Sequence, residues 1–121
     1  MNLYIETDEI LKEYNKTWDD IEFISVSYNP EKHEFSYDDK DNKTYKLDLL
    51  MFILLAKNTN YDDGYGCVEI NPSLCIVGKD WWITRDAYDG SEWWNFHTKP
   101  SLPETIISVD DLDKFKNLLE S

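Results

Sequence analysis

The order of hydrophobic and polar residues along the first third of the chain predicts a helix followed by a β-hairpin. Residues 7–16, TDEILKEYNK, carry an apolar stripe at helical spacing with acids in the first turn, and Thr7 is the expected N-cap. Residues 21–28, IEFISVSY, are β-branched and aromatic, which is typical of a strand. The short segment 34–38, EFSYD, follows a turn, and we expect it to pair with that strand.

Three further regions complete the predicted pattern. Residues 45–58, YKLDLLMFILLAKN, are rich in Leu, Met and Ala, which favours a helix buried nearly all round. Residues 67–70 and 73–77 are expected to be short strands. The last segment, 108–121, places Leu and Phe at helical spacing after Ser108, so it is expected to be a C-terminal helix capped by that serine.

Between these regions, residues 80–96, DWWITRDAYDGSEWWNF, predict a long aromatic hairpin and hold four of the five tryptophans. Asp89 and Gly90 form the turn, because both central positions of a two-residue turn need positive φ. This turn fixes the register of the two strands. The expected facing pairs are Tyr88 with Ser91, Asp86 with Trp93, Arg85 with Trp94, Thr84 with Asn95, Ile83 with Phe96, and Trp82 with His97.

Alternate residues of this hairpin point to opposite faces. The face expected to pack in the core carries Trp81, Ile83, Arg85, Ala87, Glu92, Trp94 and Phe96. The opposite face carries Trp82, Thr84, Asp86, Tyr88, Trp93, Asn95 and His97. Such a mixture of aromatic and hydrogen-bonding groups is typical of a protein-binding surface. Two alternatives stay open: other elements cover this second face as well, or a four-residue turn exchanges the two faces.

Arg85 is unusual on an apolar face. We expect it to pair with Glu92 diagonally across the strands or to stack on Trp94, in a structural role.

The composition agrees with one α+β domain over residues 1–121, with a largely antiparallel sheet flanked by N-terminal, central and C-terminal helices. Hydrophobic residues make up 41% of the chain, and it contains only four Gly and four Pro, so order is expected nearly throughout.

The charge of the chain narrows the class of partner. Twelve Lys and Arg stand against twenty-five Asp and Glu, for a formal net charge of −13. Such a field repels nucleic-acid phosphates and anionic lipids and attracts basic proteins, so we expect neither nucleic acid nor membrane as a ligand. The alternative is that the acidity only keeps the protein in solution.

The location is expected to be cytoplasmic. The chain begins with acids where a secretory signal would carry basic residues. Its longest apolar run, 49–56, is eight residues, far short of the roughly 20 that a membrane-spanning helix needs.

The sequence offers little that predicts catalysis. Cys67 and Cys75 lack CxxC spacing and are expected to be two buried free thiols, while His33 and His97 are too few and too far apart for a zinc cluster. Nucleophile-elbow, HExxH, phosphate-loop and dinucleotide motifs do not occur. We therefore expect no metal, no cofactor and no enzymatic activity. A small hydrolase with a close carboxylate pair, or with His97 as a base near Asp86, stays an alternative.

The candidate binding residues are aromatic anchors and clustered acids. The anchors are Trp82, Tyr88 and Trp93; the acids are Asp38, Asp39 and Asp41, then Asp62 and Asp63, then Asp86, Asp89 and Glu92. The first group lies in DDKDNK, which lacks the central glycine and the closing glutamate of a calcium loop and is expected to be a solvated turn. For each acid the alternative is an ordinary surface charge.

In overall character, a small, strongly acidic chain with the aromatic hairpin WWITRDAYDGSEWW and no active-site motif resembles the immunity proteins of bacterial toxin systems, including contact-dependent growth inhibition. The resemblance implies a cytoplasmic inhibitor that binds a basic cognate toxin, often a nuclease. Clustered carboxylates would match the lysines and arginines that a nuclease offers to phosphates. A second hypothesis is a nucleic-acid mimic that occupies the DNA groove of a defence protein, which would need carboxylates in an extended, phosphate-like array.

Overall fold

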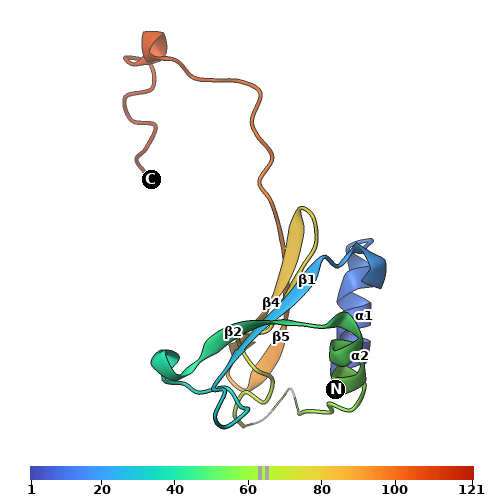
Figure 1. Ribbon diagram of the computed structural model, residues 1–121. Coiled ribbons are helices and arrows are strands. Elements are labelled where there is room, and N and C mark those ends of the chain that lie inside the picture. The colour runs from blue at the N-terminus through green and yellow to red at the C-terminus, as the bar shows by residue number, and fades with distance from the viewer. Residues whose placement is uncertain (63, 65) are drawn as a thin grey trace.

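The computed structural model describes residues 1–62, 64 and 66–121, and a five-stranded antiparallel sheet forms its centre (Figure 1). The spatial order of the strands is β2–β1–β3–β4–β5. The strands are β1 (Phe23–Tyr28), β2 (Lys43–Leu47), β3 (Cys75–Val77), β4 (Trp81–Tyr88) and β5 (Ser91–Thr98).

Two α-helices, α1 (Leu3–Glu13) and α2 (Leu49–Lys57), lie side by side on one face of this sheet (Figure 1). Among the described residues, no helix lies on the other face. Short 3₁₀ turns occur at η1 (Trp18–Asp20), η2 (Asp39–Asp41) and η3 (Val109–Asp111). The expected α+β class with a largely antiparallel sheet is confirmed.

The core lies between the sheet and the two helices. Ile24, Ile76 and Ile83 face one another across β1, β3 and β4, and each is at most 1% exposed. Trp81 and Trp94 extend this layer toward α1, where the Trp94 indole N–H donates to the Thr7 hydroxyl at 3.0 Å. One pair of hairpin tryptophans therefore belongs to the core, as the register predicts.

The long hairpin has the predicted register at all six facing pairs. Asp89 and Gly90 adopt φ values of 50° and 85°, the positive values that the two-residue turn requires. The turn sequence therefore decides which side chains of β4 and β5 reach the core.

The N-terminal helix begins earlier than its sequence pattern predicts. Asn2, not Thr7, is the N-cap, and its side chain accepts from the Ile5 N–H at 3.1 Å. Asn2 also pairs with Asn60, and the Leu3 N–H donates to the Thr59 carbonyl at 3.0 Å. These contacts with a distant segment fix the helix start, so Thr7 lies inside the helix and is fully buried.

The predicted pairing of 21–28 with 34–38 is wrong. β1 pairs instead with β2 and β3, and only an isolated bridge joins Asn29 to Glu34. The 34–38 segment folds locally because Asn42 accepts from the Ser36 N–H at 2.9 Å, which closes a loop rather than a strand ladder.

The predicted central helix 45–58 is shorter and less buried than expected. Residues 45–47 belong to β2, because Asp48 caps α2 by accepting from the Met51 N–H at 3.2 Å. Only Phe52 and Ala56 of this helix are fully buried, since α2 packs on the sheet through one side.

The predicted strand 67–70 does not form. The backbone N–H groups of Glu69 and Ile70 donate to the Glu92 carboxylate, so they are not available to a neighbouring strand. Of the predicted strand 73–77, the part 75–77 is strand β3.

The C-terminal helix expected over 108–121 is also absent from the structure. Only the 3₁₀ turn η3 forms there, and the segment extends away from the sheet and helices (Figure 1). A helix of this length without a surface to pack against is marginal in water, which explains why the apolar pattern alone does not produce it.

The predictions about the two cysteines and about membrane-spanning helices can be compared with the structure. Cys67 and Cys75 are free, as expected, but neither is fully buried, because Cys67 is exposed and Cys75 is half-buried. No helix among the described residues has the length and apolar character to cross a membrane.

Candidate partner-binding face

The face of the sheet opposite the helices is uncovered and displays the second pair of hairpin tryptophans. One cross-strand row consists of Phe23, Val77, Trp82 and His97. Trp93 is 37% exposed, and Tyr88, near the hairpin turn, is 78% exposed. The alternative in which all four tryptophans are sealed in the core is therefore wrong for Trp93, while Trp82 is half-buried.

Hydrogen bonds hold the polar and aromatic groups of this face in fixed positions. The Trp93 indole N–H donates to Asn95 Oδ1 at 3.0 Å, and Asn95 Nδ2 donates to Asp86 Oδ2 at 2.7 Å. The second oxygen of Asp86 accepts from the Ala87 N–H at 2.8 Å. Trp93 and the Asp86 carboxylate are thus held in one orientation by contacts within the protein, and groups ordered in this way would lose less entropy if they took part in binding.

His97 is a structural member of the face. Its ring stacks on Trp82 with centroids 5.4 Å apart, and its Nε2 lies 2.9 Å from the Thr84 hydroxyl. Asp86 bonds to Asn95 instead of His97, so the candidate His–Asp base pair does not form.

The acidic tip, which consists of η2 and its N-cap Asp38, adjoins the same face. Asp39 borders a hollow of about 330 Å³ whose lining includes Ser27 and Thr44 from the uncovered side of β1 and β2. Asp38 accepts from the Lys40 N–H and pairs with its ammonium at 3.5 Å, while Asp41 is exposed on η2. Of this predicted group, the structure brings Asp39 to the sheet face.

Tyr37 lies between the acidic tip and the hairpin. It is not among the binding residues that the sequence predicts. It borders a hollow of about 210 Å³ together with Asp86 and Ala87 and is highly exposed. The only available signal was its place beside Asp38, because its approach to the hairpin depends on the path of the preceding loop.

The other predicted acids have different surroundings. Asp62 is exposed and accepts from the Gly64 N–H at 3.0 Å, and Asp63 lies outside the described residues. Asp89 is exposed in the hairpin turn.

The prediction of Glu92 as an exposed partner-binding acid needs correction. Its side chain is only 2% exposed, and its carboxylate bonds to groups inside the protein. It accepts from two backbone N–H groups and from Arg85, so it cannot present a charge to a partner.

Arg85 lies at the centre of a buried hydrogen-bond network on the core side of the hairpin. Its Nη1 donates to Glu6 at 2.6 Å, and its Nη2 lies 3.2 Å from both Tyr61 Oη and Glu92 Oε1. The guanidinium also lies 4.9 Å from the centroid of the Trp94 ring. Both predicted contacts of Arg85, the pair with Glu92 and the stack on Trp94, are present.

Burial and hydrogen bonds together set the pKa values of Tyr61 and Arg85. Burial raises the pKa of Tyr61 well above the usual range, and the hydrogen bond to Glu6 acts in the same direction. Burial alone would lower the pKa of Arg85, but hydrogen bonds to Tyr61 and Glu6 outweigh it and raise that pKa. The network therefore holds a neutral phenol and a charged guanidinium, and it connects the hairpin to α1 through Glu6.

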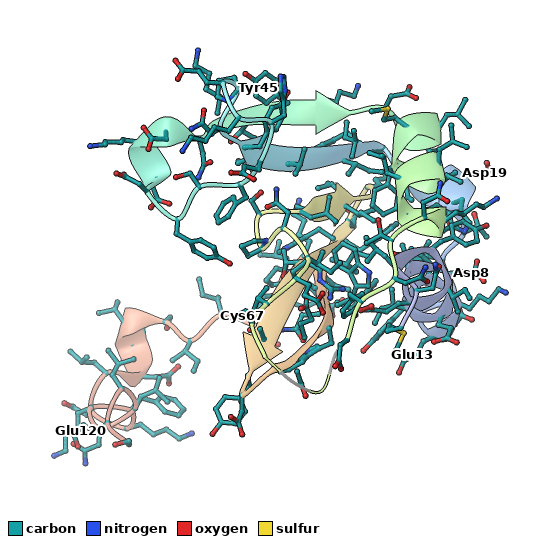
Figure 2. The ribbon with its side chains drawn as sticks, turned by 90° about the horizontal axis from the view of Figure 1, so that it is seen from below. Asp8, Glu13, Asp19, Tyr45, Cys67 and Glu120 are labelled. Atoms are coloured by element: carbon teal, nitrogen blue, oxygen red, sulfur yellow. The ribbon has the colours of Figure 1, made fainter. Side chains whose placement is uncertain are left out.

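A second acidic surface follows α1 and η1. Residues 6–22 contain seven acids and two lysines, and Figure 2 shows Asp8, Glu13 and Asp19 along the helical side of the molecule. Lys12 and the Trp18 indole N–H bond to Asp8 and lower its pKa. These acids are not among the binding residues that the sequence predicts, because the pattern of 7–16 indicates only an amphipathic helix with acids in its first turn.

The described residues contain no group of three or more His, Cys, Asp and Glu side chains placed to hold a metal ion. No family model, curated protein or solved structure matches this chain. Any function proposed for this chain therefore rests on the geometry and charge of the uncovered face.

Proposed function

We propose that this protein is a cytoplasmic inhibitor of the immunity type, which binds a basic toxin domain through the uncovered face of its sheet. The observation that carries the proposal is the exposed Trp93, fixed by Asn95 and Asp86 on a sheet face that no described helix covers. Tryptophan and tyrosine are enriched among the few residues that supply most of the binding energy at protein interfaces.

The charge of the chain supports a basic partner. A formal net charge of −13 attracts cationic surfaces and accelerates their association, whereas it repels nucleic acids. A nuclease toxin is the favoured class, because its substrate groove must carry lysine and arginine for the phosphates. Asp39, Asp86 and Asp89 would orient the complex, and Trp82, Tyr88 and Trp93 would supply its apolar contacts.

Around the uncovered face, the distribution of the candidate acids favours this function over nucleic-acid mimicry. A mimic needs carboxylates repeated at phosphate-like spacing along one strip. The candidate acids here occupy separate elements, the η2 tip and the end of the hairpin, and Glu92 is buried. We likewise propose a binding role rather than a catalytic one, since Glu92 and His97 are held in structural contacts.

The test is a pull-down from the source cell with two baits, the wild type and a Trp82→Ala/Trp93→Ala double variant. We expect a basic protein that the wild type retains and the double variant loses. Expression of that protein alone should arrest growth, and co-expression of the wild type should restore it. Equal capture by both baits, or a captured partner that is harmless to the cell, would contradict the proposal.

A further inference from the structure

The structure leaves two aliphatic surfaces of this chain uncovered. The first is the outer face of α2, whose side chains Leu50, Met51, Leu54 and Leu55 are each at least 50% exposed. The second is the segment 99–121, called the C-terminal arm below, in which Leu112 and Leu119 are 64% and 98% exposed. Burial of such side chains is favourable in water, and folded monomers rarely expose large apolar patches. Both surfaces therefore favour a state in which they are covered.

The arm is separate from the body of its own chain. Among the described residues, the single hydrogen bond between the arm and the rest of the protein joins the Lys99 N–H to the Asp80 carbonyl at 2.9 Å. Figure 1 shows the arm leading away from the sheet and both helices. Pro100 and Pro103 lie in its first five residues and favour an extended backbone, which keeps the distal part away from its own α2.

The distal part of the arm, from Ser108 on, has the sequence pattern of an amphipathic helix. In the part of the chain that the structure describes, its apolar side chains have no surface to pack against. Val109, Leu112, Phe115 and Leu119 recur at intervals of three and four residues, which places them on one helix face. Ser108 already accepts from the Asp110 N–H at 3.3 Å, as an N-cap does. In the structure Leu112, Phe115 and Leu119 line an open hollow of about 420 Å³. A packing partner would supply the stability that a short isolated helix lacks.

The outer face of α2 matches this pattern in shape and charge. Its exposed leucines lie at positions i, i+4 and i+5, the arrangement that packs against a second helix. Asp48 stands at the start of α2 and Lys57 at its end. The arm has the same order, with Asp110 and Asp111 at its start and Lys114 and Lys116 further on. An antiparallel pair of helices would bring opposite charges together at both ends.

We propose that two copies of this chain exchange arms, so that residues 108–119 of each copy fold as a helix on the outer face of α2 in the other. A second copy is the occupant that the geometry favours, because the proline-containing start of the arm carries it outward. The exchange is reciprocal and closes as a two-fold symmetric dimer, in which both aliphatic surfaces of both copies are buried.

The salt dependence separates this contact from binding of a basic partner. Each copy carries a formal charge of −13, so the copies repel each other at long range, and added salt screens this repulsion. Self-association should therefore strengthen as salt rises, while binding of a basic toxin should weaken. The two proposals do not depend on each other, because α2 and the uncovered sheet face lie on opposite sides of the sheet.

The test is sedimentation equilibrium of the full chain over a range of protein concentrations at two salt concentrations. We expect a concentration-dependent species with twice the chain mass of 14.4 kDa, favoured at the higher salt. Leu54→Asp and Leu112→Asp should each weaken dimerisation at least tenfold. The matched controls Asn117→Asp, on the polar side of the arm, and Ser91→Asp, at the exposed end of the hairpin, should not.

A mixture of the two variants identifies the exchange. In a mixed pair, the intact arm of Leu54→Asp meets the intact α2 of Leu112→Asp, so the mixture should associate more strongly than either variant alone. A monomeric wild type would overturn the proposal, as would a dimer that Leu112→Asp leaves intact. Concentration-independent hydrogen-exchange protection of 108–119 would also overturn it, because the arm would then be covered by its own chain.

Discussion

Arg85 on β4 and Glu92 on β5 form a buried ion pair, with Nη2 3.2 Å from Oε1 and side chains only 3% and 2% exposed. Glu6 on α1 and Tyr61 complete the network, which thereby joins the hairpin to the helical layer. The uncovered sheet face is the reverse side of this same hairpin. The stability of the uncovered sheet face therefore depends on the contacts of Arg85 and Glu92 on the core side of the hairpin.

Removal of Glu92 should destabilise the protein strongly. Glu92→Ala leaves Arg85 with one fewer carboxylate in a buried site and frees two backbone N–H groups, and breaking such a pair costs about 3–5 kcal/mol. Urea unfolding measures the change. Glu22→Ala, at an exposed position, is the control and should change the free energy of unfolding by less than about 0.5 kcal/mol. A similarly small effect for Glu92→Ala would mean that its carboxylate is exposed in solution.

Tyr61 should make stability fall in alkaline solution. Its pKa is raised in the folded protein above the ordinary value of 10.0, so the folded state holds the phenol proton more tightly than the unfolded state. The resulting stability is fully present below pH 10.0 and declines as the pH rises above it. The advantage of the wild type over Tyr61→Phe in urea unfolding should therefore shrink between neutral and strongly alkaline pH. An advantage that grows with pH would contradict the burial of the phenol.

Thr7 should contribute more to the stability of the protein than a threonine inside a helix usually does. Its hydroxyl donates to the Leu3 carbonyl at 2.7 Å and accepts from the Trp94 indole at 3.0 Å. Thr7→Val removes the acceptor and leaves a buried N–H unpaired, which costs about 1–3 kcal/mol. Thermal unfolding followed by tryptophan fluorescence checks this value. The exposed Thr98→Val is the control, and an equal loss for both variants would count against the buried hydrogen bond.

Gly78 should tolerate no side chain. A Cβ atom at this position would lie 2.1 Å from Cε2 and Nε1 of the Trp81 ring, which is itself packed in the core. Gly78→Ala must displace that ring, and overpacking of this kind costs about 1–3 kcal/mol. Gly64→Ala, whose added Cβ would meet its nearest atom at 3.7 Å, provides the comparison in urea unfolding. Equal stability of the two variants would show that Trp81 adjusts freely.

The binding proposal predicts different kinetic roles for charge and for Trp93. Once a partner is captured, added salt should mainly slow its association, because salt screens the long-range attraction. Trp93→Ala should mainly speed dissociation, since it removes an apolar contact that forms after docking. Surface plasmon resonance separates the two rates. Tyr45→Ala, on the opposite side of the sheet, is the matched aromatic control, and identical kinetics for the wild type and Trp93→Ala would exclude Trp93 as an anchor.

Distant segments decided several features that the sequence pattern predicted wrongly. The start of α1 depends on contacts between Asn2 and Asn60, 58 residues apart in the chain. β1 pairs with β2 instead of 34–38, and the backbone of 69–70 pairs with Glu92 instead of a strand. Each of these outcomes is a competition between a local pattern and a long-range partner. The periodicity of hydrophobic residues reports local preferences only, so it does not reveal which distant segment will bind.

The sequence by itself determined the long hairpin, because the Asp89–Gly90 turn and the alternation of side chains are local and fix the register of β4 and β5. It also determined the α+β class and the net charge of −13. Only the tertiary structure decided which face of the hairpin stays open, that Glu92 is buried, and that α2 and the C-terminal arm expose aliphatic side chains. The physical reason is that burial depends on which layer packs against a surface, and that layer comes from elsewhere in the chain.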